Sequence, residues 1–176
     1  MSILTTIQHT FYRQALKSKR KTAIGDISKM NIAAAKNIAI LFNAGNVDSN
    51  KIILKYAESL RSKGKNITVL AYVDEPKLPE GLGFDAFSKK EVNWAQVPKG
   101  NTVELFIGRE YDILLCLYTD KHSALDFLAE ASAALLKAGF YKGEDSFQTD
   151  LMVHNKNGDF SKLLLQLDEA LNKINK

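Results

Sequence analysis

The sequence predicts an α/β protein, a three-layer sandwich with a mainly parallel, Rossmann-like or flavodoxin-like sheet, preceded by a basic N-terminal helical arm. Three observations favour this class. Short apolar runs alternate along the chain with segments whose apolar residues repeat at helical spacing. The 176 residues, 45% of them hydrophobic, are enough to bury a core without disulfides. The positive charge is concentrated at the N-terminus, outside the alternating part.

The composition also excludes several classes of protein. A single cysteine rules out a disulfide-stapled secreted scaffold. Ten glycines and three prolines rule out collagen-like or long disordered sequence. No apolar run approaches the roughly 20 residues that a membrane-spanning helix needs. With one free cysteine and no export signal, we expect a cytoplasmic protein.

The charge divides the chain into two parts. Residues 1–36 contain seven basic side chains and one acidic side chain, a balance of +6. Residues 37–176 contain 17 basic and 19 acidic side chains, a balance of −2. We therefore expect a basic arm over residues 1–30 and a single α/β domain over residues 31–176.

The arm has the pattern of an amphipathic helix that Ser2 caps. Its apolar side chains fall in one stripe: Ile3/Leu4, Ile7, Phe11 and Ala15. Three interpretations are open. The helix docks this stripe on the body and leaves its basic face in solvent, it lies on an anionic membrane surface, or it contacts an acidic protein or nucleic acid. The cations available for such contacts are Arg13, Lys17, Lys19, Arg20 and Lys21.

The first half of the body predicts a right-handed βαβ unit. The apolar run 37–42 is a buried strand that ends in the turn-forming residues Asn43–Asn46. Asp48 or Ser49 then caps a helix that ends at Gly64. Residues 67–73 are rich in β-branched side chains and apolar on both faces, as a covered parallel strand requires.

The middle of the chain is predicted to consist mostly of connecting loops. Prolines and glycines punctuate residues 74–100, which contain one short strand candidate at 84–87. Residues 102–107 fit a short strand or a helical turn. Residues 113–118 form the most apolar run and predict a central strand.

The C-terminal part predicts a helix, a strand and a second helix. The first helix runs over 123–138, and Gly139 closes it. A final strand is expected over 147–153, bounded by the turn residues 155–158. Asp159 caps the terminal amphipathic helix.

Several strings in the chain resemble a family of uncharacterised bacterial proteins of this length. They are AKNIAILFNAGNVDS, VNW, YDILLCL, AGFYKG and DLMVH. The resemblance covers nearly the whole chain and implies a basic N-terminal helix before a small α/β domain. It implies no activity, cofactor or catalytic residue, because the family has none assigned.

A ligand site is expected where parallel strands end, near the switch in strand order. The first loop carries one glycine where a dinucleotide fingerprint has three, and it lacks the lysine of a phosphate loop. It either holds an anion at the next helix N-terminus or forms a plain turn with Asn and Asp caps. No cofactor is assigned. The candidate ligand-binding residues are Asn43, Gly45, Asn46, Asp74, Asp120 and His122.

The catalytic candidates are Asp120, His122 and Ser123, as a carboxylate, a base and a nucleophile. The alternative is that Asp120 or Ser123 caps the helix, with a neutral His122 on the surface of its first turn. Metal binding is not expected, because the histidines are far apart and lack a ligand motif. Cys116 is expected to be a buried small hydrophobic residue.

Two functions follow from these patterns. The first is a non-enzymatic interaction protein whose basic helix contacts an acidic partner or surface. The second is a small-ligand or nucleotide-binding domain, possibly an enzyme, that uses the strand-end loops.

Overall fold

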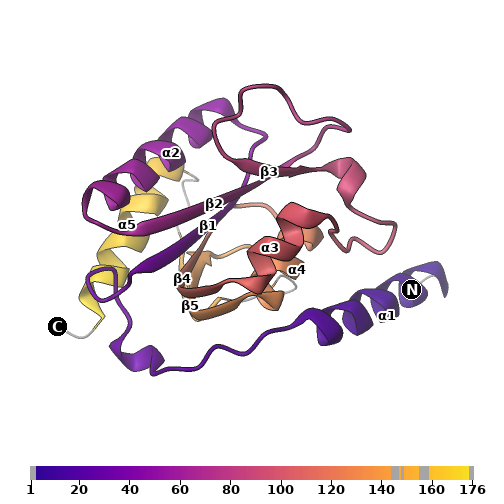
Figure 1. The fold of residues 1–176 in the computed structure, drawn as a ribbon, viewed down its shortest axis with the longest axis horizontal. Coiled ribbons are helices and arrows are strands. Elements are labelled where there is room, and N and C mark those ends of the chain that lie inside the picture. The colour runs from indigo at the N-terminus through magenta and orange to yellow at the C-terminus, as the bar shows by residue number, and fades with distance from the viewer. Residues whose placement is uncertain (1–2, 144–146, 148, 155–158, 175–176) are drawn as a thin grey trace.

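The computed structural model describes residues 3–143, 147, 149–154 and 159–174, folded around one sheet (Figure 1). In this part of the chain the sheet has six parallel strands in the order β3-β2-β1-β4-β5-β6. The order reverses between β1 and β4, as in the doubly wound dinucleotide-binding arrangement and unlike the flavodoxin one. The strands are β1 (Asn37–Asn43), β2 (Asn66–Val73), β3 (Asp85–Ser88), β4 (Glu110–Leu117), β5 (Ala133–Phe140) and β6 (Leu151–Val153). The predicted α/β class is confirmed.

Helices cover both faces of the sheet (Figure 1). α2 and α5 pack on one face, and α3 and α4 pack on the other, with α1 outside them. The helices are α1 (Ile3–Lys19), α2 (Val47–Ser62), α3 (Asn101–Gly108), α4 (Ser123–Ala131) and α5 (Phe160–Lys173), with 3-10 turns η1 (Ile27–Lys29) and η2 (Lys89–Glu91).

Alternation along β1 divides the core between the two faces. Ile38, Ile40 and Phe42 are buried in the cluster with α2 and α5. Ala39 and Leu41 are buried in the cluster with α3 and α4. Because both sides of β1 are covered, the strand reads as a continuous apolar run, which is why the sequence predicts it correctly.

Most predicted elements of the first 120 residues are present. The strands expected at 37–42, 67–73, 84–87 and 113–118 correspond to β1, β2, β3 and β4. The ambiguous segment 102–107 is helical and lies in α3.

The cap of α2 differs from the prediction. Asn46 caps the helix, and its side-chain oxygen accepts hydrogen bonds from the backbone N–H groups of Asp48 and Ser49 at 3.0 and 2.9 Å. Asp48 therefore lies inside the first turn, where its negative charge interacts favourably with the positive end of the helix dipole.

The single long helix predicted over 123–138 is wrong. α4 ends at Ala131, and residues Ala133–Phe140 form β5. The alanine-rich sequence fits a helix by propensity, but the small side chains also fit a strand covered on both sides, and tertiary packing decides. Gly139 lies in β5, opposite Cys116, instead of closing a helix. A Cβ there would lie 2.8 Å from the carbonyl oxygen of Cys116, so the position requires glycine.

The last elements agree with the prediction in part. β6 contains Leu151–Val153 and is shorter than the strand expected over 147–153, of which residue 148 lies outside the described residues. Asp159 caps α5 as expected and accepts from the backbone N–H of Lys162 at 3.2 Å. The predicted cap at Ser2 and the turn at 155–158 also lie outside the described residues.

The helix of the arm is confirmed as α1, which docks on the body. Docking through the whole predicted stripe is wrong, because Leu4, Ile7 and Phe11 of that stripe are exposed. Leu16 is buried in the core cluster with α3 and α4, and Tyr12 and Ala15 pack against that cluster. After α1 the chain runs without regular structure along the molecule to η1 (Figure 1). The backbone N–H of Lys21 donates to the carbonyl of Ala131 at 3.0 Å, which ties this segment to the end of α4. The division of the chain at residue 30 stays a prediction.

Candidate functional site

A groove of about 990 Å³ lies between α1 and the body. We call it the α1 groove. One wall is the face of α1 that carries basic side chains, and the opposite wall comes from the loop before α4 and from α4 itself. Its charged lining residues are Arg13, Lys17, Arg20, Lys121, Asp126 and Glu130.

Contacts near the middle and the C-terminal end of α1 keep the groove in shape. The hydroxyl of Tyr12 donates to the carbonyl of Ser123 at 3.1 Å, and its ring meets Phe127 edge-on at 5.3 Å. Lys19 forms an ion pair with Glu104 of α3. Burial raises the pKa of Tyr12 well above its usual range, and the nearby carboxylates of α4 add to the shift, so this hydroxyl stays a donor.

The cations predicted for the arm divide into two groups. Arg13, Lys17 and Arg20 line the α1 groove, and Arg20 lies 3.8 Å from the carboxylate of Glu130. Lys19 faces Glu104, and the side chain of Lys21 is exposed outside the groove lining.

Three groove cations have no acidic partner. Within the described ranges, Arg13, Lys17 and Lys121 form no ion pair. The groove therefore presents positive charge that no ion pair among the described residues neutralises.

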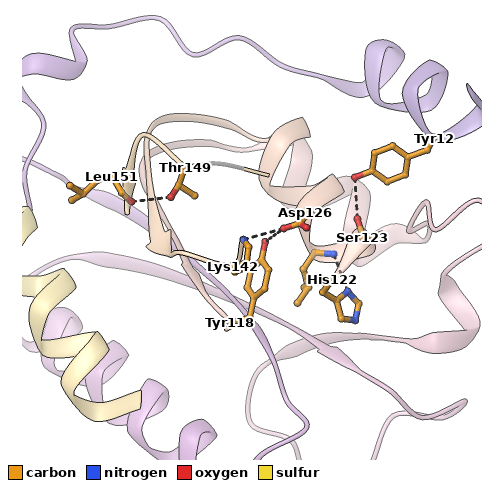
Figure 2. A network of polar contacts seen from close by, with 9 residues as sticks. Tyr12, Tyr118, His122, Ser123, Asp126, Lys142, Thr149 and Leu151 are labelled. Carbon is orange, nitrogen blue, oxygen red and sulfur yellow. Dashed lines mark hydrogen bonds and ion pairs between the residues drawn. The ribbon is translucent and has the colours of Figure 1, made fainter. Parts of the chain in front are cut away.

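A buried polar cluster lies behind the groove wall (Figure 2). One oxygen of Asp126 accepts from the hydroxyl of Tyr118 at 2.9 Å and lies 3.1 Å from Nζ of Lys142. The Lys142 side chain is 1% exposed, and its Nζ also lies 4.1 Å from the centre of the Tyr118 ring. Burial raises the pKa of Tyr118, and Cys116 and Asp126 reinforce the shift.

Sequence reasoning missed this cluster. Asp126 is the one acid inside the apolar segment 124–129, and such a residue is rarely buried unless it is paired. That isolation was the available signal for Asp126. No neighbouring residue in the sequence indicates that Lys142 is the partner of Asp126. Lys142 follows β5, and most of β5 was predicted to be part of a helix.

His122 is the N-cap of α4, so the prediction that Asp120 or Ser123 caps this helix is wrong. Its Nδ1 accepts from the backbone N–H of Leu125 at 3.4 Å. The ring is half-buried against Tyr72, with ring centres 4.3 Å apart, instead of lying on the surface. Burial lowers the pKa of His122, partly opposed by nearby carboxylates, in the direction expected for a neutral imidazole.

The strand-end loops bring some predicted residues together. The hydroxyl of Tyr72 donates to Asp74 at 2.9 Å and its ring contacts His122, so Asp74 and His122 share this tyrosine as a neighbour. That hydrogen bond and Lys89, at 3.2 Å, lower the pKa of Asp74. Asp120 is exposed after β4.

The loop after β1 uses its polar groups internally. Asn43 accepts from the backbone N–H of Gly45 at 3.1 Å. Asn46 occupies two N–H groups at the start of α2, which are the donors an anion would need. Among the described residues no side-chain hydrogen bond joins Asn43, Gly45 or Asn46 to His122.

The catalytic candidates form no linked set. No hydrogen bond joins the Ser123 hydroxyl to His122 within the described part of the chain. The backbone carbonyl of Ser123 accepts a hydrogen bond from the hydroxyl of Tyr12. Burial raises the pKa of the Cys116 thiol to about 12, so it is a poor nucleophile. The described residues contain no group of three metal-ligating side chains and no helix long and apolar enough to cross a membrane.

The sequence model of a family of unknown function (DUF6913) matches residues 8–174. No curated protein matches the chain.

Proposed function

We propose that this chain, which belongs to the DUF6913 family of unknown function, is an interaction protein whose α1 groove binds an acidic segment of a partner protein. One observation carries the proposal. A groove of about 990 Å³ is lined by Arg13, Lys17 and Lys121, which have no ion pair among the described residues. Carboxylates that enter this groove meet cations that project from the docked α1 and from the loop before α4.

The mixed charge of the groove favours a peptide over a nucleic acid. Glu130 lines it beside the cations, whereas the carboxylate of Asp126 is buried against Lys142. A nucleic acid carries a phosphate at every nucleotide and would meet the carboxylate of Glu130, whereas a peptide places its acids at intervals. The uncharged lining residue Gln96 offers hydrogen bonds to a peptide backbone, and the amide oxygen of Gln8 offers an acceptor.

The geometry of Tyr12 also disfavours nucleic acid. Single-stranded nucleic acids bind through aromatic side chains on which bases stack. Tyr12 lines the groove, but its ring packs against Phe127 and its hydroxyl is bonded to Ser123. It therefore contributes to the docking of α1 and does not form a free stacking surface.

The test is the affinity of the full-length protein for a fluorescent peptide that contains glutamate at every third position. We expect R13E/K17E to weaken binding at least about tenfold, because attraction becomes repulsion at two adjacent positions. The control K55E/K63E makes the same charge change on exposed side chains in α2 and at its C-terminal cap. Fluorescence anisotropy at low and high salt measures the affinity, and binding to the native protein should weaken with salt.

Three results would contradict the proposal. Equal loss in both double variants would mean that only net charge matters. Unchanged binding in R13E/K17E would remove the groove from the interaction. Tighter binding of a single-stranded RNA of the same length would identify nucleic acid as the partner.

A small-ligand site at the strand ends is the second candidate. It is supported by Tyr72, which contacts both Asp74 and His122. Its ligand would perturb the NMR signals of these side chains and leave those of Arg13 and Lys17 unchanged. A ligand that perturbs only the arm would contradict it.

A further inference from the structure

A second surface of α1 is apolar and exposed. Leu4 is 76% exposed, Phe11 52% and Trp94 60%, and Ile7 is also exposed. We call the surface formed by Leu4, Ile7, Phe11 and Trp94 the apolar seam. Exposed apolar residues are common one at a time, but a group that joins two distant segments of chain indicates an interface.

Contacts within the single chain fix the geometry of the apolar seam. The rings of Phe11 and Trp94 meet edge-on with centres 5.2 Å apart. The side-chain amide of Gln8 donates to the carbonyl of Trp94 at 2.8 Å. The loop around Trp94 is folded on Asn93, whose side-chain oxygen accepts from the N–H groups of Ala95 and Val97. A prearranged aromatic pair of this kind is typical of the centre of protein interfaces.

The positions of the charges around α1 indicate what covers the seam. With 3.6 residues per turn, Arg13 projects about 160° away from Phe11, and Lys17 about 120° away. The residues beside the seam on its solvent side are uncharged: Thr10, Gln14 and Ser18. Helices that lie in a membrane surface carry cations on the polar face, where anionic headgroups can reach them. In α1 these cations line the α1 groove against the body instead.

The same distribution suits a second copy of this chain. Two basic helices normally repel each other, but here their cations point away from the surfaces that would meet. The apolar positions are separated by three and four residues, which is the spacing of a narrow helix–helix seam. In an antiparallel pair centred on Ile7, the Leu4 end of each helix meets the Phe11 end of the other.

We propose that the protein forms a two-fold symmetric dimer through the apolar seam, with the two α1 helices antiparallel. The α1 grooves lie on the far side of each helix and stay open in this dimer. The inference is independent of the proposed function, because the two surfaces share no charged residue.

The seam is small. A fully buried aromatic side chain contributes roughly 150–250 Å² of surface, and each copy offers two half-exposed aromatic and two aliphatic side chains. Such a contact falls at or below the low end of stable interfaces, near about 1,200 Å². We therefore expect a reversible dimer with a dissociation constant in the micromolar range or weaker.

Sedimentation velocity tests this on the full-length protein between about 1 and 500 μM, a range that brackets micromolar affinity. The expected mass rises from 19.6 kDa toward twice that value with concentration. Trp94 is the chain's one tryptophan, so its emission should shift to the blue over the same range. I7E should remain monomeric throughout, because it places two carboxylates at the centre of the seam.

The control is L165E, at a leucine of α5 that is 59% exposed. It makes the same kind of change away from α1 and should dimerise like the native protein. The Trp94 emission of dilute I7E should match that of the dilute native protein, which shows that Phe11 and α1 stay in place. If I7E alters this emission, I7Q replaces it in the same assay.

Two results would overturn the proposal. A native protein that stays monomeric at the highest concentration excludes self-association. A dimer that I7E and L165E affect equally excludes this seam. In either case, binding to phosphatidylserine vesicles that I7E abolishes and L165E spares would identify a lipid surface as the occupant.

Discussion

At the scale of single residues, the buried pair of Asp126 and Lys142 is the most consequential contact. Nζ of Lys142 makes no well-aligned hydrogen bond, so within the described residues its burial is compensated by the ion pair with Asp126 and by the Tyr118 ring. A buried charge that loses its partner is strongly destabilising, whereas replacing both partners by uncharged groups is often neutral.

We therefore expect D126N to lower the free energy of unfolding by about 3–5 kcal/mol. The amide oxygen can still accept from Tyr118, so the loss reports the unpaired ammonium. Combining it with K142M should recover much of the loss, because no buried charge remains. Urea unfolding of both single variants and the double variant measures the coupling. A strictly additive double variant would contradict this account.

His122 gives stability a pH dependence. Burial lowers its native pKa below the ordinary value of 6.5, so the unfolded chain takes up a proton at a higher pH than the native protein does. Its contribution to stability is therefore complete above about pH 6.5 and declines as the pH falls below that value.

In H122N this part of the pH dependence should disappear, while Asn preserves a good helix cap. Urea unfolding at about pH 7.5, 6.5 and 5.5 would show a smaller decline for the variant than for the native protein. Equal declines would mean that His122 is not the titrating group.

At the scale of elements, the contact between β4 and β5 depends on Gly139. An added Cβ would lie 2.8 Å from the carbonyl oxygen and 2.9 Å from the Cβ of Cys116, both in a strand that cannot easily move. We expect G139A to cost roughly 1–3 kcal/mol, as overpacking in a core typically does.

G108A is the matched control for this prediction. Gly108 ends α3, and nothing lies within 4 Å of an added Cβ there. Chemical unfolding should show that G108A is neutral or slightly stabilising. A cost for G108A as large as that for G139A would point to glycine loss in general and not to the close approach of the strands.

The elements also show how far sequence reasoning reaches. β1 and β4 are correctly predicted because covering both faces requires an uninterrupted apolar run. β5 is missed because Ala133–Phe140 is compatible with both a helix and a covered strand, and only its pairing with β4 decides. The wrong prediction for that segment also prevented the prediction of the Asp126–Lys142 pair, because β5 places Lys142 beside Asp126.

The candidate site was predictable only in part. The charge count singled out Arg13, Lys17 and Arg20, and these side chains line the α1 groove. The count could not show that Lys19 faces Glu104, because that pair is 85 residues apart in the sequence. Nor could the apolar stripe show which side of α1 docks, since Leu16 and Tyr12 lie beside the stripe and not in it.

At the scale of the whole molecule, the sheet order has a consequence for how the chain reaches this state. β1 pairs with β4 through Ile38 and Ile113, so its second neighbour is synthesised about 75 residues later. Pairings this distant form slowly, because a long loop must close before any contact stabilises it. During synthesis the apolar edge of β1 is therefore open until β4 has emerged, and that interval is when a nascent chain of this fold most needs a chaperone.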